Sequence, residues 1–226
     1  MTNPSILNRS NVQHLRNLGF NLAAIALVLA LVGIGIAYKI DDWSNDNQNL
    51  PSLRTAGPTI NKSIGGQQLA IPPAWFKSAE QRNQEFSERI DLIFALPLGP
   101  NGRIKEIGVS LQPLNMVRSS ARLLDAVYLH QFVPQQIDGP IGLVGKPLKN
   151  AEGYQDETVW YDPLSVDPFV AKCIKSITQA ASSDCVRIVP LNAQIAATYA
   201  FDQEVLDEWK RFDAEAALWL NQIGGI

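Results

Sequence analysis

The chain has 226 residues, a hydrophobic share of 46% and a formal net charge of −3, which is enough for one domain with a sizeable core. Residues 1–40 hold three basic side chains (Arg9, Arg16 and Lys39) and no acidic one, so 16 basic and 22 acidic residues are left for the remainder. This acidic balance argues against a nucleic-acid partner.

The first predicted element is a transmembrane helix over residues 18–40, preceded by a short tail over residues 1–17. The stretch from Asn17 to Tyr38 contains no charged residue, and as a helix it would span roughly 33 Å, which matches the hydrocarbon core of a bilayer. A cleaved secretory signal would need a shorter apolar region that ends in small residues. We therefore predict an uncleaved anchor in the lipid bilayer, with a cleaved signal and a buried soluble helix as the alternatives.

The charges beside this helix predict its orientation. Arg9 and Arg16 precede it, and the first acidic residue is Asp41. Basic residues favour the cytoplasmic side, although Lys39 runs against that rule. We expect the N-terminus in the cytoplasm and the C-terminal part in the periplasm, at a bacterial inner membrane.

One face of the predicted transmembrane helix is lined by small residues. They follow one another at steps of three and four: Ala23, Ala26, Ala30, Gly33 and Ala37. Small residues let helices approach closely in lipid. The pattern predicts docking on another membrane protein or self-association, although alanine is common enough in such segments for chance to explain it.

After the helix, residues 41–58 are polar and interrupted by Pro51 and Pro58, as is typical of a tether. An exported α+β domain is predicted over residues 59–226. Its first part contains two hairpins, turned by Gly65-Gly66 and by residues 100–102. The strands of these hairpins are predicted at Thr59–Ile64, Gln67–Ile71, Ile90–Leu96 and Ile107–Leu111.

A helix is predicted from Ser119 or Ser120 to about Phe132, with an apolar face that includes Leu123, Val127 and His130. Glycines and prolines then punctuate the chain, and Gly139, Gly142 and Gly145 are expected in turns and sheet crossings because no phosphate-binding motif surrounds them. Short strands follow around Val144 and at Thr158–Tyr161, Phe169–Ile174, Cys185–Val189 and Ile195–Phe201.

The last predicted element is an amphipathic helix from about Gln203 to Ile223, capped by Asp202. Its apolar stripe consists of Val205, Trp209, Phe212, Ala216, Trp219 and Ile223. The stripe packs either on the domain's own sheet or in a partner's groove. Altogether we predict an α+β fold, with a mostly antiparallel sheet and a C-terminal helix.

Two cysteines, Cys173 and Cys185, lie in the predicted exported domain. In an oxidising compartment such a pair most simply forms a disulfide, with free thiols as the alternative. A metal site would need histidines or a CxxC spacing nearby, and the sequence has neither. No metal or other cofactor is expected.

Acidic and aromatic residues gather before and within one predicted strand. A possible ligand or partner surface there consists of Tyr154, Asp156, Glu157, Trp160, Tyr161 and Asp162. Carboxylates beside an aromatic platform suit glycan chemistry, but turns at Asp162-Pro163 and Asp167-Pro168 beside an ordinary strand explain the pattern more simply. His130 is the only exported histidine, and its position on an apolar face favours a core residue over a catalytic one.

No motif in the chain specifies a reaction. We therefore predict a single-pass membrane-anchored accessory or structural subunit that acts through protein contacts of its transmembrane helix and exported domain. The alternatives are an exported ligand- or glycan-binding module and a membrane-anchored hydrolase that uses residues 152–169. A eukaryotic secretory pathway also stays open, because Asn61-Lys62-Ser63 fits an N-glycosylation acceptor.

Overall fold

A computed structural model describes residues 51–53, 57–84, 87–149, 156–175 and 184–226. The predicted tail, the transmembrane helix with its small-residue face and most of the tether lie outside these residues, as does Tyr154. No helix within the described ranges is long and apolar enough to cross a membrane. Residues 51–226 form one compact unit.

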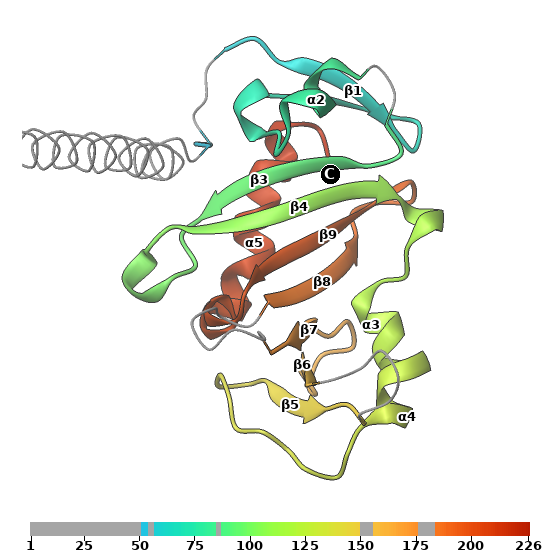
Figure 1. Ribbon diagram of the computed structural model, residues 1–226, viewed down its shortest axis with the longest axis vertical. Helices are drawn as coiled ribbons and strands as arrows, with labels where there is room; N and C mark the ends of the chain where they lie inside the picture. Colours follow the sequence, from blue (N-terminus) through green and yellow to red (C-terminus); the bar gives the residue numbers. More distant parts are fainter. Residues whose placement is uncertain (1–50, 54–56, 85–86, 150–155, 176–183) are drawn as a thin grey trace, which may run out of the picture. The chain divides into compact units, whose positions relative to one another are not determined.

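The centre of this unit is a seven-stranded antiparallel sheet in the order β3-β4-β9-β8-β7-β6-β5 (Figure 1). A separate hairpin, β1 (Ile60–Ile64) and β2 (Gln67–Ile71), precedes it. The strands of the sheet are β3 (Ile90–Leu96), β4 (Lys105–Pro113), β5 (Val144–Pro147), β6 (Glu157–Tyr161), β7 (Val170–Ile174), β8 (Asp184–Pro190) and β9 (Ile195–Asp202). The predicted mostly antiparallel sheet is therefore confirmed.

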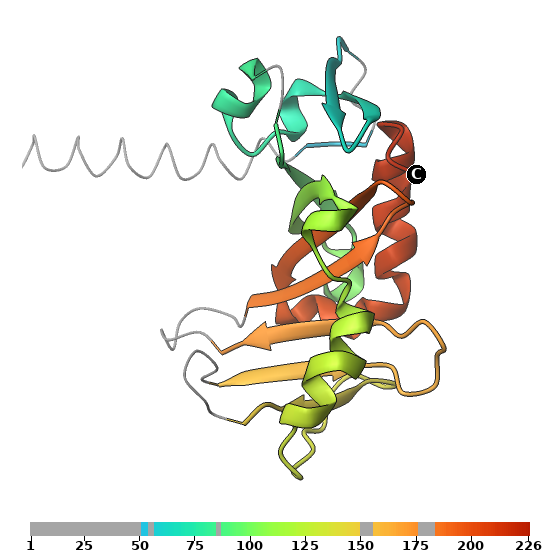
Figure 2. The same cartoon turned by 90° about the vertical axis from the view of Figure 1, so that its right-hand side faces the viewer.

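The C-terminal helix covers one face of the sheet. It begins with a 3-10 segment, η5 (Gln203–Glu208), where the Asp202 side chain accepts a hydrogen bond from the Glu204 amide, and continues as α5 (Trp209–Gln222). Figure 2 shows α5 along one side of the strands. The predicted stripe packs on the domain's own sheet, and all of its residues except Trp209 are buried.

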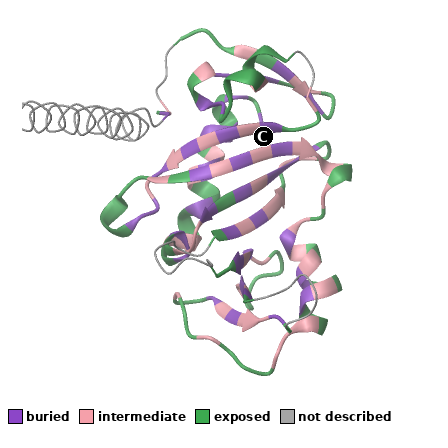
Figure 3. Cartoon of the chain, viewed as in Figure 1, coloured by how far each residue is buried: buried purple, intermediate pink, exposed green. Residues whose placement is uncertain are grey.

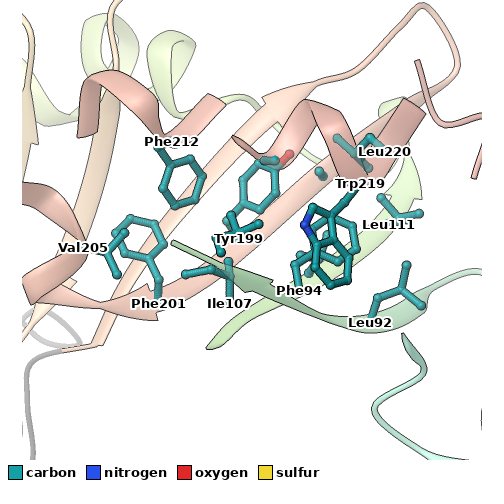
Figure 4. Packing of buried hydrophobic residues seen from close by; sticks show 14 of the residues in the cluster. Leu92, Phe94, Ile107, Leu111, Tyr199, Phe201, Val205, Phe212, Trp219 and Leu220 are labelled. Carbon is teal, nitrogen blue, oxygen red and sulfur yellow. The ribbon is translucent and has the colours of Figure 1, made fainter. Parts of the chain in front are cut away.

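Alternation along the strands supplies the other half of this core, because successive side chains of a strand point to opposite faces. Figure 3 shows buried and intermediate residues alternating along β3, β4 and β9. The buried side chains meet α5 around Trp219, whose ring centroid lies 4.5 Å from that of Trp75 and 5.0 Å from that of Phe94. Figure 4 shows this packing.

A second, smaller core lies on the opposite face, under the segment formed by α3 (Ser120–Leu123), the π-helical η4 (Leu124–Tyr128) and α4 (Leu129–Gln131). Leu124 and Tyr128 are buried there against β6 and β7. Leu123 and Val127 of the predicted apolar face pack against the same core but are only partly buried. His130 is exposed, so the expectation of a core histidine was wrong.

Between β2 and β3 the chain forms the 3-10 turn η1 (Pro73–Trp75) and the short helix α2 (Ala79–Asn83). Two further 3-10 turns, η2 (Pro100–Gly102) and η3 (Leu114–Met116), flank β4.

Near α2, burial alone would raise the pKa of Asp91. Hydrogen bonds from Arg89, Ser110 and Gln81 outweigh burial and hold that pKa below its ordinary value.

Candidate functional site

The seven-stranded sheet is split between β7 and β8. These strands pair through three residue pairs only, Lys172–Val186, Cys173–Cys185 and Ile174–Asp184, whereas β8 pairs with β9 along its whole length. Beyond Val186 no pairing joins β8 to the first residues of β7, and the view of Figure 2 shows the two strands diverging. The sheet therefore consists of two parts, β3-β4-β9-β8 and β7-β6-β5.

Side chains take the place of the missing strand pairing. The Ser120 hydroxyl, on the first turn of α3, accepts a hydrogen bond of 2.8 Å from the Ile188 amide. The Arg187 Nη1 donates to the Val170 carbonyl over 3.4 Å. Ser119, not Ser120, caps the helix by accepting from the Arg122 amide. Ser120 thus connects the helical segment to the edge of β8.

The predicted disulfide between Cys173 and Cys185 is present. The two cysteines are direct partners in the β7–β8 register, and both are buried. The disulfide therefore fastens the two parts of the sheet at the short segment where they still pair.

An ion pair connects the split to α5. Arg187 of β8 is buried, and its Nε and Nη2 donate to the two carboxylate oxygens of Asp213 over 3.3 and 2.7 Å. The guanidinium carbon also lies 4.3 Å from the ring centroid of Phe169, in cation–π geometry. Asp213 is 57% exposed, so the pair extends from the buried strand to the surface of the helix.

Tyr199 of β9 lies beside this pair and is 2% exposed. Figure 4 shows its ring among the core residues, with the hydroxyl oxygen on the side of α5. Burial raises the pKa of Tyr199, and the nearby Asp213 carboxylate raises it further against the opposing effect of Arg187. None of the groups in the described part of the chain forms a hydrogen bond with the hydroxyl, and the Tyr199 side chain lines a cavity.

Arg187, Tyr199 and Asp213 line a cavity of about 510 Å³, which we call the split cavity. Its lining combines aliphatic residues with seven polar ones, five of which are charged: Arg122, Asp125, Asp167, Arg187 and Asp213. Its lining consists of Ser119, Ala121, Arg122, Asp125, Val166, Asp167, Pro168, Arg187, Ile188, Val189, Pro190, Leu191, Tyr199, Asp213, Ala217, Leu220 and Ile226.

The loop between β6 and β7 exposes two aliphatic side chains, of which Val166 lines the split cavity. Leu164 is 90% exposed and Val166 is fully exposed. The loop holds itself in place, since the Asp162 carboxylate accepts from the Leu164 amide and the Ser165 hydroxyl donates to the Asp167 carbonyl. This site was not predicted from the sequence, although a signal is present: Leu164 and Val166 lie between Asp162-Pro163 and Asp167-Pro168.

The predicted acidic-aromatic surface is distributed over both faces of β6. Glu157 and Tyr161 point toward the helical segment, where Glu157 pairs with Lys172 over 2.8 Å and Tyr161 stacks on Phe132. Trp160 points to the opposite face and joins the main core. The structure therefore does not gather these side chains on one surface, and ligand or partner binding by them stays a prediction.

Three of the predicted residues, Asp156, Glu157 and Trp160, nevertheless line a second cavity of about 580 Å³. Glu157 Oε2 and Trp160 Nε1 are buried and have no hydrogen-bond partner among the residues that the structure describes. Asp156 adopts a positive φ of 55° at the start of β6. Asp162 contributes instead to the Leu164 loop.

The glycines at 139, 142 and 145 have different roles from one another. Gly142 has a φ of 96° in a turn that the Leu143 amide closes on the Pro140 carbonyl. Gly139 and Gly145 make room for the Trp160 ring, because a Cβ at either position would lie 2.1 or 2.6 Å from its Cζ3 atom. The expectation of turns and sheet crossings was therefore correct for Gly142 but missed the packing role of Gly139 and Gly145.

Neither a known protein family nor a curated protein matches the sequence. Among solved structures, the fold is similar to that of an immunity protein of the Stenotrophomonas maltophilia type IV secretion system. The TM-score is 0.52 and the identity 11%, and the match covers 73% of this chain and 92% of that one. At this identity the likeness concerns the fold alone.

Proposed function

We propose that the protein is a membrane-anchored accessory subunit whose exported domain binds another protein at the split cavity. The observation that carries this proposal is the exposure of Leu164 and Val166 on one loop, which its own hydrogen bonds hold in place and whose Val166 lines the split cavity. Covering two aliphatic side chains of this size stabilises a complex by roughly 1.5 to 3 kcal/mol each if they become fully buried. A partner that covers them would gain this free energy without having to order the loop first.

The charges around the loop favour a protein over a lipid surface as the occupant. Asp162 and Asp167 flank the two aliphatic side chains, and anionic headgroups would repel these carboxylates. The structural neighbour is an immunity protein, and a role through protein contacts agrees with that description.

The remaining parts of the proposal concern the anchor. Residues 18–40 cross the inner membrane, residues 41–58 form the tether, and the domain that follows lies in the periplasm. The small-residue face, centred on Ala30 and Gly33, packs against a helix of the same partner or of a second copy. Leucines at these two positions should weaken the association by holding the helices apart, and an unchanged association would remove this part of the proposal.

The test is native co-purification of the full chain from mild detergent. A partner should accompany the wild-type chain in near-stoichiometric amount. Val166→Glu should abolish its recovery, because a carboxylate would be desolvated at the interface. Ile104→Glu is the matched control, since Ile104 is exposed on the β3–β4 connection and should leave recovery unchanged. Equal recovery from both variants, with melting temperatures like that of the wild type, would exclude the loop of Val166 as the binding surface.

A second candidate function is an exported ligand-binding module that uses the cavity at Asp156, Glu157 and Trp160. The observation in its favour is the pair of buried, unpartnered atoms on Glu157 and Trp160. A glycan offers hydroxyl groups that both donate and accept, so one could donate to the Glu157 oxygen or accept from the Trp160 N–H. If no stoichiometric partner accompanies the wild-type chain, that result favours this function or a hydrolase over the accessory subunit.

A further inference from the structure

We infer that the split cavity recognises an aliphatic group that carries a neutral hydrogen-bond acceptor, such as an amide carbonyl. This inference rests on the proposed function and names the chemistry that the partner presents there: an aliphatic residue together with an adjoining peptide carbonyl.

The Tyr199 hydroxyl provides a donor at the cavity wall. The Tyr199 residue is 2% exposed and lines the split cavity, and its hydroxyl forms no hydrogen bond with another described residue, so the O–H group can donate to a molecule in the cavity. The raised pKa of Tyr199 keeps the hydroxyl protonated. A ligand acceptor would therefore complete a hydrogen bond that the folded chain leaves open.

The neighbouring ion pair favours a neutral acceptor over a charged one. The Arg187 guanidinium is already compensated by the Asp213 carboxylate at 2.7 Å. A carboxylate ligand would meet the like charge of Asp213, and an ammonium would meet that of Arg187. The three hydrogen bonds of Arg187 use three of its five N–H groups, so the guanidinium retains donors for the same carbonyl.

The walls of the cavity favour an aliphatic body. Val189 and Leu191 contribute from the end of β8 and its connection to β9, and Ala217 and Leu220 from α5. No aromatic ring other than that of Tyr199 appears among the described lining residues, so the cavity offers no stacking platform for a base or a sugar ring. A branched aliphatic chain would pack against this aliphatic part of the wall, and the rest of the lining is polar or charged.

The test uses three small probes of one shape: isobutyramide, isobutyrate and isobutylammonium. Each is titrated into the full chain in detergent, with the methyl resonances of Val189, Leu191 and Leu220 as reporters. Isobutyramide should shift these methyls and bind more tightly than either charged probe. Tyr199→Phe should weaken the binding of isobutyramide about 2- to 13-fold, the range expected for one net hydrogen bond. The melting temperature of the protein should not fall.

Tyr161→Phe is the matched control, because it removes a hydroxyl on the other face of the sheet and should leave the affinity unchanged. Tighter binding of isobutyrate would overturn the neutral-acceptor inference, and equal affinity in Tyr199→Phe would overturn the role of the hydroxyl. Absence of methyl shifts with every probe would remove the cavity as the site.

The partner itself provides the second measurement. Tyr199→Phe should also reduce recovery of the co-purified protein, whereas a free small amide as the natural ligand would leave that recovery unchanged and overturn the partner's part in the inference. If Val166→Glu abolishes recovery while Tyr199→Phe changes neither recovery nor amide affinity, the proposed function stands and this inference fails. Retained recovery in Val166→Glu means that the proposed function itself fails.

Discussion

Removal of the Cys173–Cys185 disulfide should destabilise the domain by about 3 kcal/mol. The bond closes a loop with a sequence separation of 12, and the chain-entropy relation assigns about 3 kcal/mol to a loop of that length. Either Cys173→Ala or Cys185→Ala alone breaks the bond completely. The double variant should therefore lose only a little more than each single variant, because it adds just the loss of a second buried sulfur atom.

Denaturant unfolding of the four proteins in this double-mutant cycle measures the free energies. Single-variant losses of about 3 kcal/mol that add to about 6 kcal/mol would refute the reasoning, because independent packing at each site would then explain them. Hydrogen exchange provides the local readout. Since β7 and β8 share only three residue pairs, the amides of β5, β6 and β7 should exchange faster in the variants, while those of β3, β4 and β9 should change less. An equal increase of the exchange rate in all strands would contradict the inference that the two parts of the sheet open separately.

Three further predictions concern the core and the sheet. Gly145→Ala should destabilise the domain by about 1 to 3 kcal/mol, because the new Cβ would overlap the facing indole ring; Gly108→Ala, where a Cβ meets only ordinary contacts, should change the unfolding free energy little. Trp219→Ala should cost about 3 to 5 kcal/mol and Trp209→Ala clearly less, because Trp209 is only partly buried; equal shifts in thermal unfolding would contradict this ranking. The lowered pKa of Asp91 stabilises the fold above about pH 4 and loses that contribution as the pH falls through the folded-state value, so stability curves of the wild type and Asp91→Asn should converge in acid.

Local patterns in the sequence were sufficient to predict the strands and the C-terminal helix. Alternation at Ile90–Leu96 and glycines at 65 and 66 depend only on neighbours along the chain, and both hairpins are confirmed. The stripe of α5 follows the helical period in the same way. The disulfide was predictable because two cysteines with a short separation leave few alternatives. The anchor over residues 18–40 is also a conclusion of the sequence alone, and it stays a prediction.

Only the tertiary structure decided where the candidate site lies. The Ser120–Ile188 hydrogen bond joins residues 68 positions apart, and the Arg187–Asp213 pair joins residues 26 apart. No local period encodes such contacts. The acidic-aromatic segment illustrates the same limit: Trp160 and Tyr161 are adjacent in sequence, but a strand directs them to opposite faces. From the sequence alone, Tyr199 is indistinguishable from any other core aromatic residue. Only the fold places its hydroxyl beside Arg187 and Asp213 at the wall of the split cavity.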